Sequence, residues 1–128
     1  MKLLLDTHAA LFMWMDRSRL SPTARTLLES PGNTVVFSQV STWEICLKYH
    51  TGKLPLPEPP RRYLPKRLRQ SELAYEPIAD EAVFRTVELP SHHHDPFDRL
   101  LIATALILKV PILSADTAFR RYSAEVIW

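Results

Sequence analysis

Glycine is scarce in this sequence: of 128 residues, only Gly32 and Gly52 are glycine. A Gly-rich phosphate loop and a dinucleotide-binding turn each need several glycines at short fixed spacings, so the sequence excludes both. Cysteine is scarcer still, because Cys46 is the only one. An intramolecular disulfide and a zinc site built from several cysteines are therefore excluded as well.

Long apolar runs are also missing. The most apolar stretch, 100–108, is far below the ~18 residues that a membrane-spanning helix needs. Near the N-terminus, the run Leu3-Leu4-Leu5 is too short for the apolar core of a signal peptide, and it ends at Asp6. We therefore expect a cytoplasmic protein that has no membrane partner.

The overall composition is that of a folded globular protein. Apolar residues make up 46% of the chain and charged residues 23%, which argues against a disordered chain. The length predicts one domain over residues 1–128. The net charge is only +2, but five basic residues fall within nine positions: Arg61, Arg62, Lys66, Arg67 and Arg69. This basic segment is either a solvated helix face or a binding surface for a polyanion.

Short β-like runs alternate with helical stretches along the chain. The expected strands are 2–5, 34–37, 73–78, 111–114 and 125–128. The expected helices are 7–15, 22–29, 41–49, a basic helix to about residue 70 that Pro65 interrupts or kinks, then 80–87, 96–109 and 116–122. This alternation predicts an α/β fold, a three-layer α/β/α sandwich around a mostly parallel sheet.

Four acidic residues stand where expected strands give way to helices. Asp6 follows the first strand, and Glu44 lies in the first turn of the helix after the second strand. Asp98 opens the most apolar helix, and Asp116 follows the strand at 112–113. Because parallel strands end at one edge of the sheet, these four carboxylates are expected to converge there.

Each acid also has an alternative role as a helix cap. Residues 41–44 fit the capping box S-x-x-E, with Glu44 as its acid. Asp95 fits an N-cap, because Pro96 follows it at the first helical position. Asp6 and Asp116 can cap the helices that follow them. Capping explains each acid singly, whereas the coincidence of all four at one edge favours a functional site.

A cluster of carboxylates requires a cation. Two carboxylates ~4 Å apart repel by about 4 kcal/mol at an effective dielectric constant of 20. Oxygen ligands without cysteine favour Mg²⁺ or Mn²⁺ over a soft metal. Such ions activate water and stabilise leaving oxygens in phosphodiester cleavage.

The sequence resembles a known family. Leu3-Leu4-Leu5-Asp6-Thr7-His8, Ser38 with Trp43-Glu44-Ile45, the block from His94 to Ala103 that contains Asp95-Pro96-Phe97-Asp98-Arg99, and the block from Ser114 to Phe119 resemble the ordered motifs of PIN domains. The likeness is strongest to the VapC-type toxins of bacterial toxin–antitoxin pairs. It implies a Mg²⁺- or Mn²⁺-dependent endoribonuclease whose catalytic and metal-binding residues are Asp6, Glu44, Asp98 and Asp116. The last acid is the most variable in the family.

Several polar residues near these acids have two interpretations. Thr7 either orients the neighbouring acid or is a first-turn helix residue, and Ser38 is either a supporting residue or a turn hydroxyl. Arg99 either binds phosphate or pairs with an acid, and the pairing is favoured. Three consecutive histidines cannot easily face one ion, so His92-His93-His94 is expected to be a solvated loop near the substrate. Asp95 is expected to be mainly an N-cap.

The expected helix 7–15 is apolar all round. A helix in a small domain turns one face to the core, which would leave Phe12 or Trp14 in water unless the helix is simply buried within the fold. The resemblance implies that this helix lies at an interface with a second copy and with an antitoxin, and Trp43 and Tyr49 can extend that surface. A basic side chain of the antitoxin would then enter the acidic site.

Two other functions remain open from the sequence. A non-catalytic PIN-like binding module would keep the fold without the chemistry, although the intact set of acids speaks against it. A receiver-like phosphoacceptor domain also gathers acids at the edge of a parallel sheet. It needs paired acids after the first strand, however, whereas only Asp6 stands there.

Overall fold

A computed structural model describes residues 1–128. Its centre is a sheet of five parallel strands in the order β3-β2-β1-β4-β5. The strands are β1 (Lys2–Leu5), β2 (Thr34–Ser38), β3 (Ala74–Glu76), β4 (Ile112–Leu113) and β5 (Val126–Ile127). The expected α/β sandwich is confirmed, and the sheet is parallel throughout. A receiver domain has the order 2-1-3-4-5, so the receiver-like alternative is wrong.

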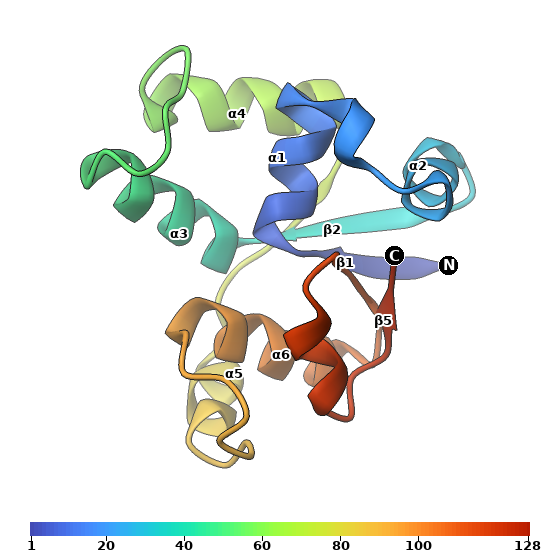
Figure 1. The fold of residues 1–128 in the computed structure, drawn as a ribbon, viewed down its shortest axis with the longest axis vertical. Helices are drawn as coiled ribbons and strands as arrows, with labels where there is room; N and C mark the ends of the chain where they lie inside the picture. The colour runs from blue at the N-terminus through green and yellow to red at the C-terminus, as the bar shows by residue number, and fades with distance from the viewer.

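Helices cover both faces of the sheet. They are α1 (Thr7–Met15), α2 (Pro22–Glu29), α3 (Gln39–His50), α4 (Pro60–Ser71), α5 (Asp80–Thr86) and α6 (Pro96–Leu108), with short 3₁₀ helices η1 (Arg17–Arg19) and η2 (Thr117–Arg121). Figure 1 shows α1, α3 and α4 on one face and α5 and α6 on the other, with both chain ends at the same side. None of these helices combines the length and the apolar character that crossing a membrane requires.

The alternating side chains of the strands form two cores. Leu3 and Leu5 pack with α1 and α3, whereas Leu4 packs on the other face with α6. All three leucines have no exposed surface. Because helices bury both faces of a parallel sheet, its strands are apolar at successive positions, which explains the unbroken run at the N-terminus.

The helices differ from expectation in three respects, apart from shifts of a residue or two at the ends of elements. The third helix begins at Gln39 rather than at residue 41, because the side chain of Ser38 caps it by accepting a hydrogen bond from the Val40 N–H. Helix α4 runs unbroken through Pro65. Pro65 is exposed, and because it has no backbone N–H the helix loses one hydrogen bond there. The segment after Asp116 is a 3₁₀ helix rather than an α-helix.

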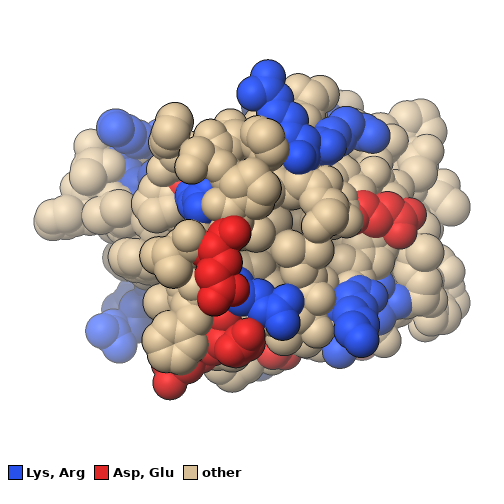
Figure 2. All heavy atoms as spheres, turned by 90° about the horizontal axis from the view of Figure 1, so that it is seen from below, with Lys and Arg blue, Asp and Glu red and all other residues tan.

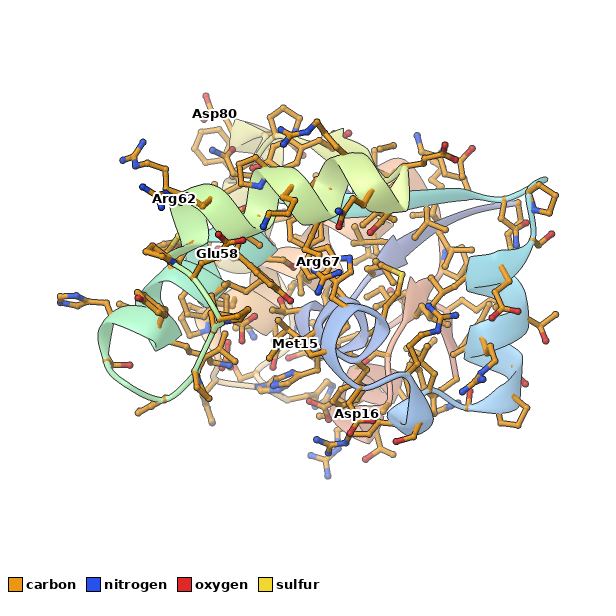
Figure 3. The ribbon with its side chains drawn as sticks, turned by 90° about the horizontal axis from the view of Figure 1, so that it is seen from above. Met15, Asp16, Glu58, Arg62, Arg67 and Asp80 are labelled. Carbon is orange, nitrogen blue, oxygen red and sulfur yellow. The ribbon has the colours of Figure 1, made fainter.

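The aromatic side chains of α1 are covered within the chain itself. Trp14 is 9% exposed, and its indole Nε1 donates to the Ser71 hydroxyl at 2.7 Å. Phe12 is half-buried: the centre of the Trp128 ring lies 6.3 Å from the centre of the Phe12 ring, and the Arg19 guanidinium lies over the Phe12 ring. The expectation that α1 leaves large aromatics in water was therefore wrong. The sequence argument gave this helix a single face turned to the core, but α4 packs beside α1 on the same side of the sheet and contacts Trp14 through Tyr63 and Ser71 (Figure 3).

Candidate functional site

The carboxyl edge of the sheet gathers the acids singled out in the sequence. Asp6 follows β1 directly, and Glu44 lies in the second turn of α3. Both residues are only 2% exposed. The capping-box interpretation of residues 41–44 was wrong, because Ser38 rather than Ser41 caps α3. Glu44 therefore needs a different explanation for its burial.

Asp6 is held by the neighbouring strand. It occupies the N-cap position of α1, yet its side chain makes no capping hydrogen bond. Instead its Oδ2 accepts from the hydroxyl of Ser114, which follows β4, at 2.8 Å. Burial raises the pKa of Asp6, and this outweighs the lowering by the Ser114 hydrogen bond and by His8; the charges of Glu44 and Asp116 add to the rise.

Glu44 is paired on one oxygen only. The ammonium of Lys48, one helical turn further along α3, donates to Oε2. Burial acts to lower the pKa of Lys48, but the hydrogen bond and the charge of Glu44 raise it overall. The other oxygen, Oε1, is buried and has no hydrogen-bond partner. A buried carboxylate oxygen without a partner is costly, so this atom marks a position for a bound cation or donor.

Asp95 and Asp98 open α6 in different roles. Asp95 caps the helix, as expected, because its Oδ1 accepts from the N–H groups of Phe97 at 2.8 Å and Asp98 at 3.1 Å. The side chain of Asp98 is 14% exposed. Burial, together with the charges of Asp95 and of the three other site acids, raises the pKa of Asp98 to about 8. These acids are therefore close enough to repel one another.

Asp116 lies at the outer rim of the cluster. Its side chain is 44% exposed, and its Oδ1 caps η2 by accepting from the Ala118 N–H at 2.9 Å. Its Oδ2 lies 3.9 Å from Nε2 of His93, and the same nitrogen lies 2.8 Å from Oδ2 of Asp98. Potential ligand atoms of these three residues lie within 4.8 Å of one another.

The histidine run does not behave as one solvated loop. His92 and His94 are exposed, whereas His93 is half-buried and contacts Asp98. The expectation was therefore wrong for His93. Nothing within three identical residues marks the middle one, because the choice depends on how the loop folds onto the acids.

Two further neighbours of the acids were not singled out from the sequence. Lys48 contacts Glu44 and Ser114 contacts Asp6. Lys48 had a usable signal, because it stands four residues after an acid on a helix, where side chains face each other. Ser114 had a weaker one, because it ends a strand beside the strand that precedes Asp6.

Thr7 and Arg99 form no hydrogen bond with the site acids and instead connect the elements around them. The hydroxyl of Thr7 shares a hydrogen bond of 2.8 Å with that of Ser41, which ties α1 to α3. Arg99 was expected to pair with an acid, and this was wrong. Its guanidinium donates to the carbonyls of Thr86, Leu89, Pro90 and His93 and to the Tyr122 hydroxyl.

We expect the metal-free protein to lose stability as the pH rises from about 4 to about 8. The folded-state pKa of Asp98, about 8, lies above the ordinary value of 3.8, so the unfolded chain releases this proton first. The resulting decrease in the free energy of unfolding is on the order of 3 kcal/mol after discounting for solvent. Urea unfolding in EDTA across this pH range measures it, and a constant or rising stability would contradict this account.

The chain is similar to known proteins both in sequence and in fold. The PIN domain model matches residues 3–125. Ribonuclease VapC16 from Mycobacterium tuberculosis is 41% identical over 46 residues, which cover 36% of this chain and 33% of that protein. The match thus spans about a third of that relative's length.

Two solved structures share the fold over nearly their whole length. VapBC2 from Rickettsia felis, bound to a DNA fragment from its promoter, matches with a TM-score of 0.74 at 18% identity, over 99% of this chain and 98% of that one. FitAcB from Neisseria gonorrhoeae matches with a TM-score of 0.63 at 21% identity, over 98% and 96% of the two chains. At these identities the likeness shows the fold.

Proposed function

Because the chain belongs to the PIN domain family, we propose that it is a metal-dependent endoribonuclease and the toxin of a type II toxin–antitoxin pair, with residues 1–128 as one nuclease domain. The observation that carries the proposal is the acidic cluster, in which a buried oxygen of Glu44 lacks a partner. The similar protein named a ribonuclease supports the activity. A solved toxin–antitoxin complex from Klebsiella pneumoniae, which has the same fold, supports the biological role.

The residues fit a hard divalent cation. Asp6, Glu44, Asp98 and Asp116 offer only oxygen atoms, and burial is the main cause that raises the pKa values of Asp6 and Asp98. These four carboxylates would hold Mg²⁺, or Mn²⁺ in its place. When bound, such an ion neutralises the cluster, makes water a better nucleophile and stabilises the charge on the phosphate.

The chain's own residues keep the acids in place for this chemistry. Ser114 fixes one oxygen of Asp6 and Lys48 fixes one oxygen of Glu44, so that one oxygen of each carboxylate stays free. The ammonium of Lys48 also offsets part of the negative charge that would otherwise repel RNA. Asp116 lies at the exposed rim of the cluster, the side from which we expect the substrate to enter.

The direct test is an RNA cleavage assay with the purified protein. We expect internal cleavage in Mg²⁺ or Mn²⁺, and none in EDTA or with Ca²⁺. Total RNA, transfer RNA and ribosomal RNA serve as separate substrates, since the proposal names the class of substrate and not one sequence. An absence of cleavage in every pool, with folded protein that binds RNA, would favour the non-catalytic binding module instead.

The proposed protein partners are a cognate antitoxin and a second copy of the chain, alone or within a larger toxin–antitoxin assembly. Because other parts of the chain cover the aromatics of α1, only Met15 of that helix is a strongly exposed apolar side chain, and most of the apolar surface available to a partner lies elsewhere. Trp43 and Leu47 of α3 and Val83 and Val87 near α5 are exposed. Trp43, Val83 and Val87 line a groove of about 530 Å³, so this face, rather than α1, supports a homodimer.

The basic segment on α4 is proposed to bind RNA. Figure 3 shows Arg62 pointing away from the helix into solvent and Arg67 turned toward α1. Arg61 and Arg69 are exposed, whereas Lys66 pairs with Glu58 at 2.5 Å. On the α5 and α6 side, acidic and basic side chains are interspersed, so that face offers no comparable patch (Figure 2).

Replacing Arg61, Arg62 and Arg69 together with glutamine is expected to weaken RNA binding and to flatten its salt dependence. Each lost phosphate contact lowers the slope of log K against log salt by about 0.7 for a single strand. Binding titrations at several salt concentrations measure the slope. The control is Arg25→Gln with Lys2→Gln, two exposed basic residues outside α4 and away from the carboxyl edge of the sheet. An unchanged slope in the triple variant would show that α4 is only a solvated face.

A further inference from the structure

His93 approaches the acids from the loop between α5 and α6. Its Nε2 lies 2.8 Å from Oδ2 of Asp98 and 3.9 Å from Oδ2 of Asp116. Its ring also lies 6.3 Å from that of Phe119, and the side chain is 19% exposed. A half-buried imidazole in contact with an acid of the cluster either binds the metal or holds the acid.

The other ring nitrogen decides between these roles. Nδ1 of His93 accepts a hydrogen bond from the backbone N–H of Asp95 at 3.1 Å. A nitrogen that accepts a hydrogen bond carries no proton, so in the neutral ring the proton resides on Nε2. A metal-binding histidine shows the opposite arrangement, because its second nitrogen donates. Nε2–H of His93 is therefore a donor to Asp98.

Arg99 fixes the backbone that carries this ring. Its Nη1 donates to the carbonyl of His93 at 3.2 Å and to that of Pro90 at 2.9 Å. Asp95 is fixed in turn, because it caps α6. The backbone of His93 and the Asp95 N–H that its ring contacts are thus both held in place. The local fold therefore directs the imidazole toward Asp98.

We propose that His93 is a positioning residue of the metal centre: its Nε2–H holds Oδ2 of Asp98, so that Oδ1 faces the cation. The inference rests on the proposed metal site. It completes a pattern, because Ser114 holds Asp6 and Lys48 holds Glu44 by one oxygen each. Partners of this kind change metal affinity by about 10–100-fold in other proteins.

The test measures metal binding without RNA. Calorimetric titration with Mn²⁺ and Mg²⁺ compares the wild-type protein with His93→Leu, His93→Gln and His94→Leu. We expect His93→Leu to bind both ions about tenfold or more weakly. His93→Gln keeps an N–H donor and restores most of the affinity. His94→Leu, a change in the exposed neighbour, leaves it unaltered. Wild-type affinity in a folded His93→Leu variant would overturn the proposal.

Two spectroscopic measurements on the wild-type chain keep the proposal falsifiable even where His93→Leu does not fold. The ¹⁵N chemical shifts of the imidazole in the metal-free protein should identify the Nε2–H form. Pulsed electron paramagnetic resonance of the Mn²⁺-loaded protein should show no directly bonded nitrogen. The Nδ1–H form would contradict the proposal, because Nε2 would then have no proton to donate to Asp98. A bonded nitrogen signal that His93→Gln removes would also contradict it, because His93 would then be a ligand of the metal. Because none of these measurements involves RNA, a failed cleavage assay leaves them intact.

Discussion

The variants Asp6→Asn and Asp98→Asn are expected to lose metal-dependent RNA cleavage by at least about a hundredfold while remaining folded. Each change replaces a charged oxygen ligand with an amide of the same shape. Asp6 is buried at the end of the central strand and Asp98 at the start of α6, so the two flank the proposed cation from different elements. Initial cleavage rates at saturating Mg²⁺ measure the effect.

The stability of the same variants separates a site defect from a folding defect. Asp98→Asn removes a carboxyl whose pKa is raised to about 8 by burial and by neighbouring acids. The metal-free variant should therefore be more stable than the wild type at about pH 8, and it should lack most of the pH dependence described above.

The matched control is Glu125→Gln, an exposed acid beside β5. It makes the same change of charge without touching the cluster, so it should keep full activity and stability. Wild-type cleavage by Asp6→Asn or Asp98→Asn would contradict the proposed site. Loss of cleavage that is accompanied by unfolding would trace the effect to stability instead.

The sequence predicted those features that depend on local pattern. The unbroken run Leu3-Leu4-Leu5 predicted a buried parallel strand, and Asp95-Pro96 predicted the start of α6. The placement of acids after strands predicted that they would approach one another. Each of these follows from periodicity, from capping or from the direction of parallel strands.

Features that depend on contacts between helices far apart in the sequence, or on the conformation of a loop, were not predicted. Trp14 reaches Ser71 across 57 positions of sequence, and no local pattern shows that α4 covers α1. His93 and its two neighbours are chemically identical in sequence, and only the loop conformation separates them. The charge of Arg99 suggested an acidic partner, but the guanidinium mainly contacts backbone carbonyls. Because every residue has a carbonyl, the sequence does not show which of them Arg99 reaches.

Arg99→Met is expected to destabilise the protein by about 3–5 kcal/mol. The guanidinium donates to four backbone carbonyls, three of them at 2.9–3.2 Å, and to the Tyr122 hydroxyl at 3.4 Å. The four carbonyls span 86–93, the end of α5 and the loop before α6, where the chain has little regular structure. Methionine has a similar length but no donor, so these carbonyls lose their shared partner.

Urea unfolding of the metal-free protein measures this loss. Arg99→Lys should recover only part of it, because one ammonium has three donors and lacks the planar fork that reaches both sides of the loop. Arg121→Met, a change in an exposed arginine, should stay within about 0.5 kcal/mol of the wild type. If Arg99→Met were equally mild, the loop would hold its shape without Arg99, and the direction of His93 toward Asp98 would depend on the Asp95 cap alone.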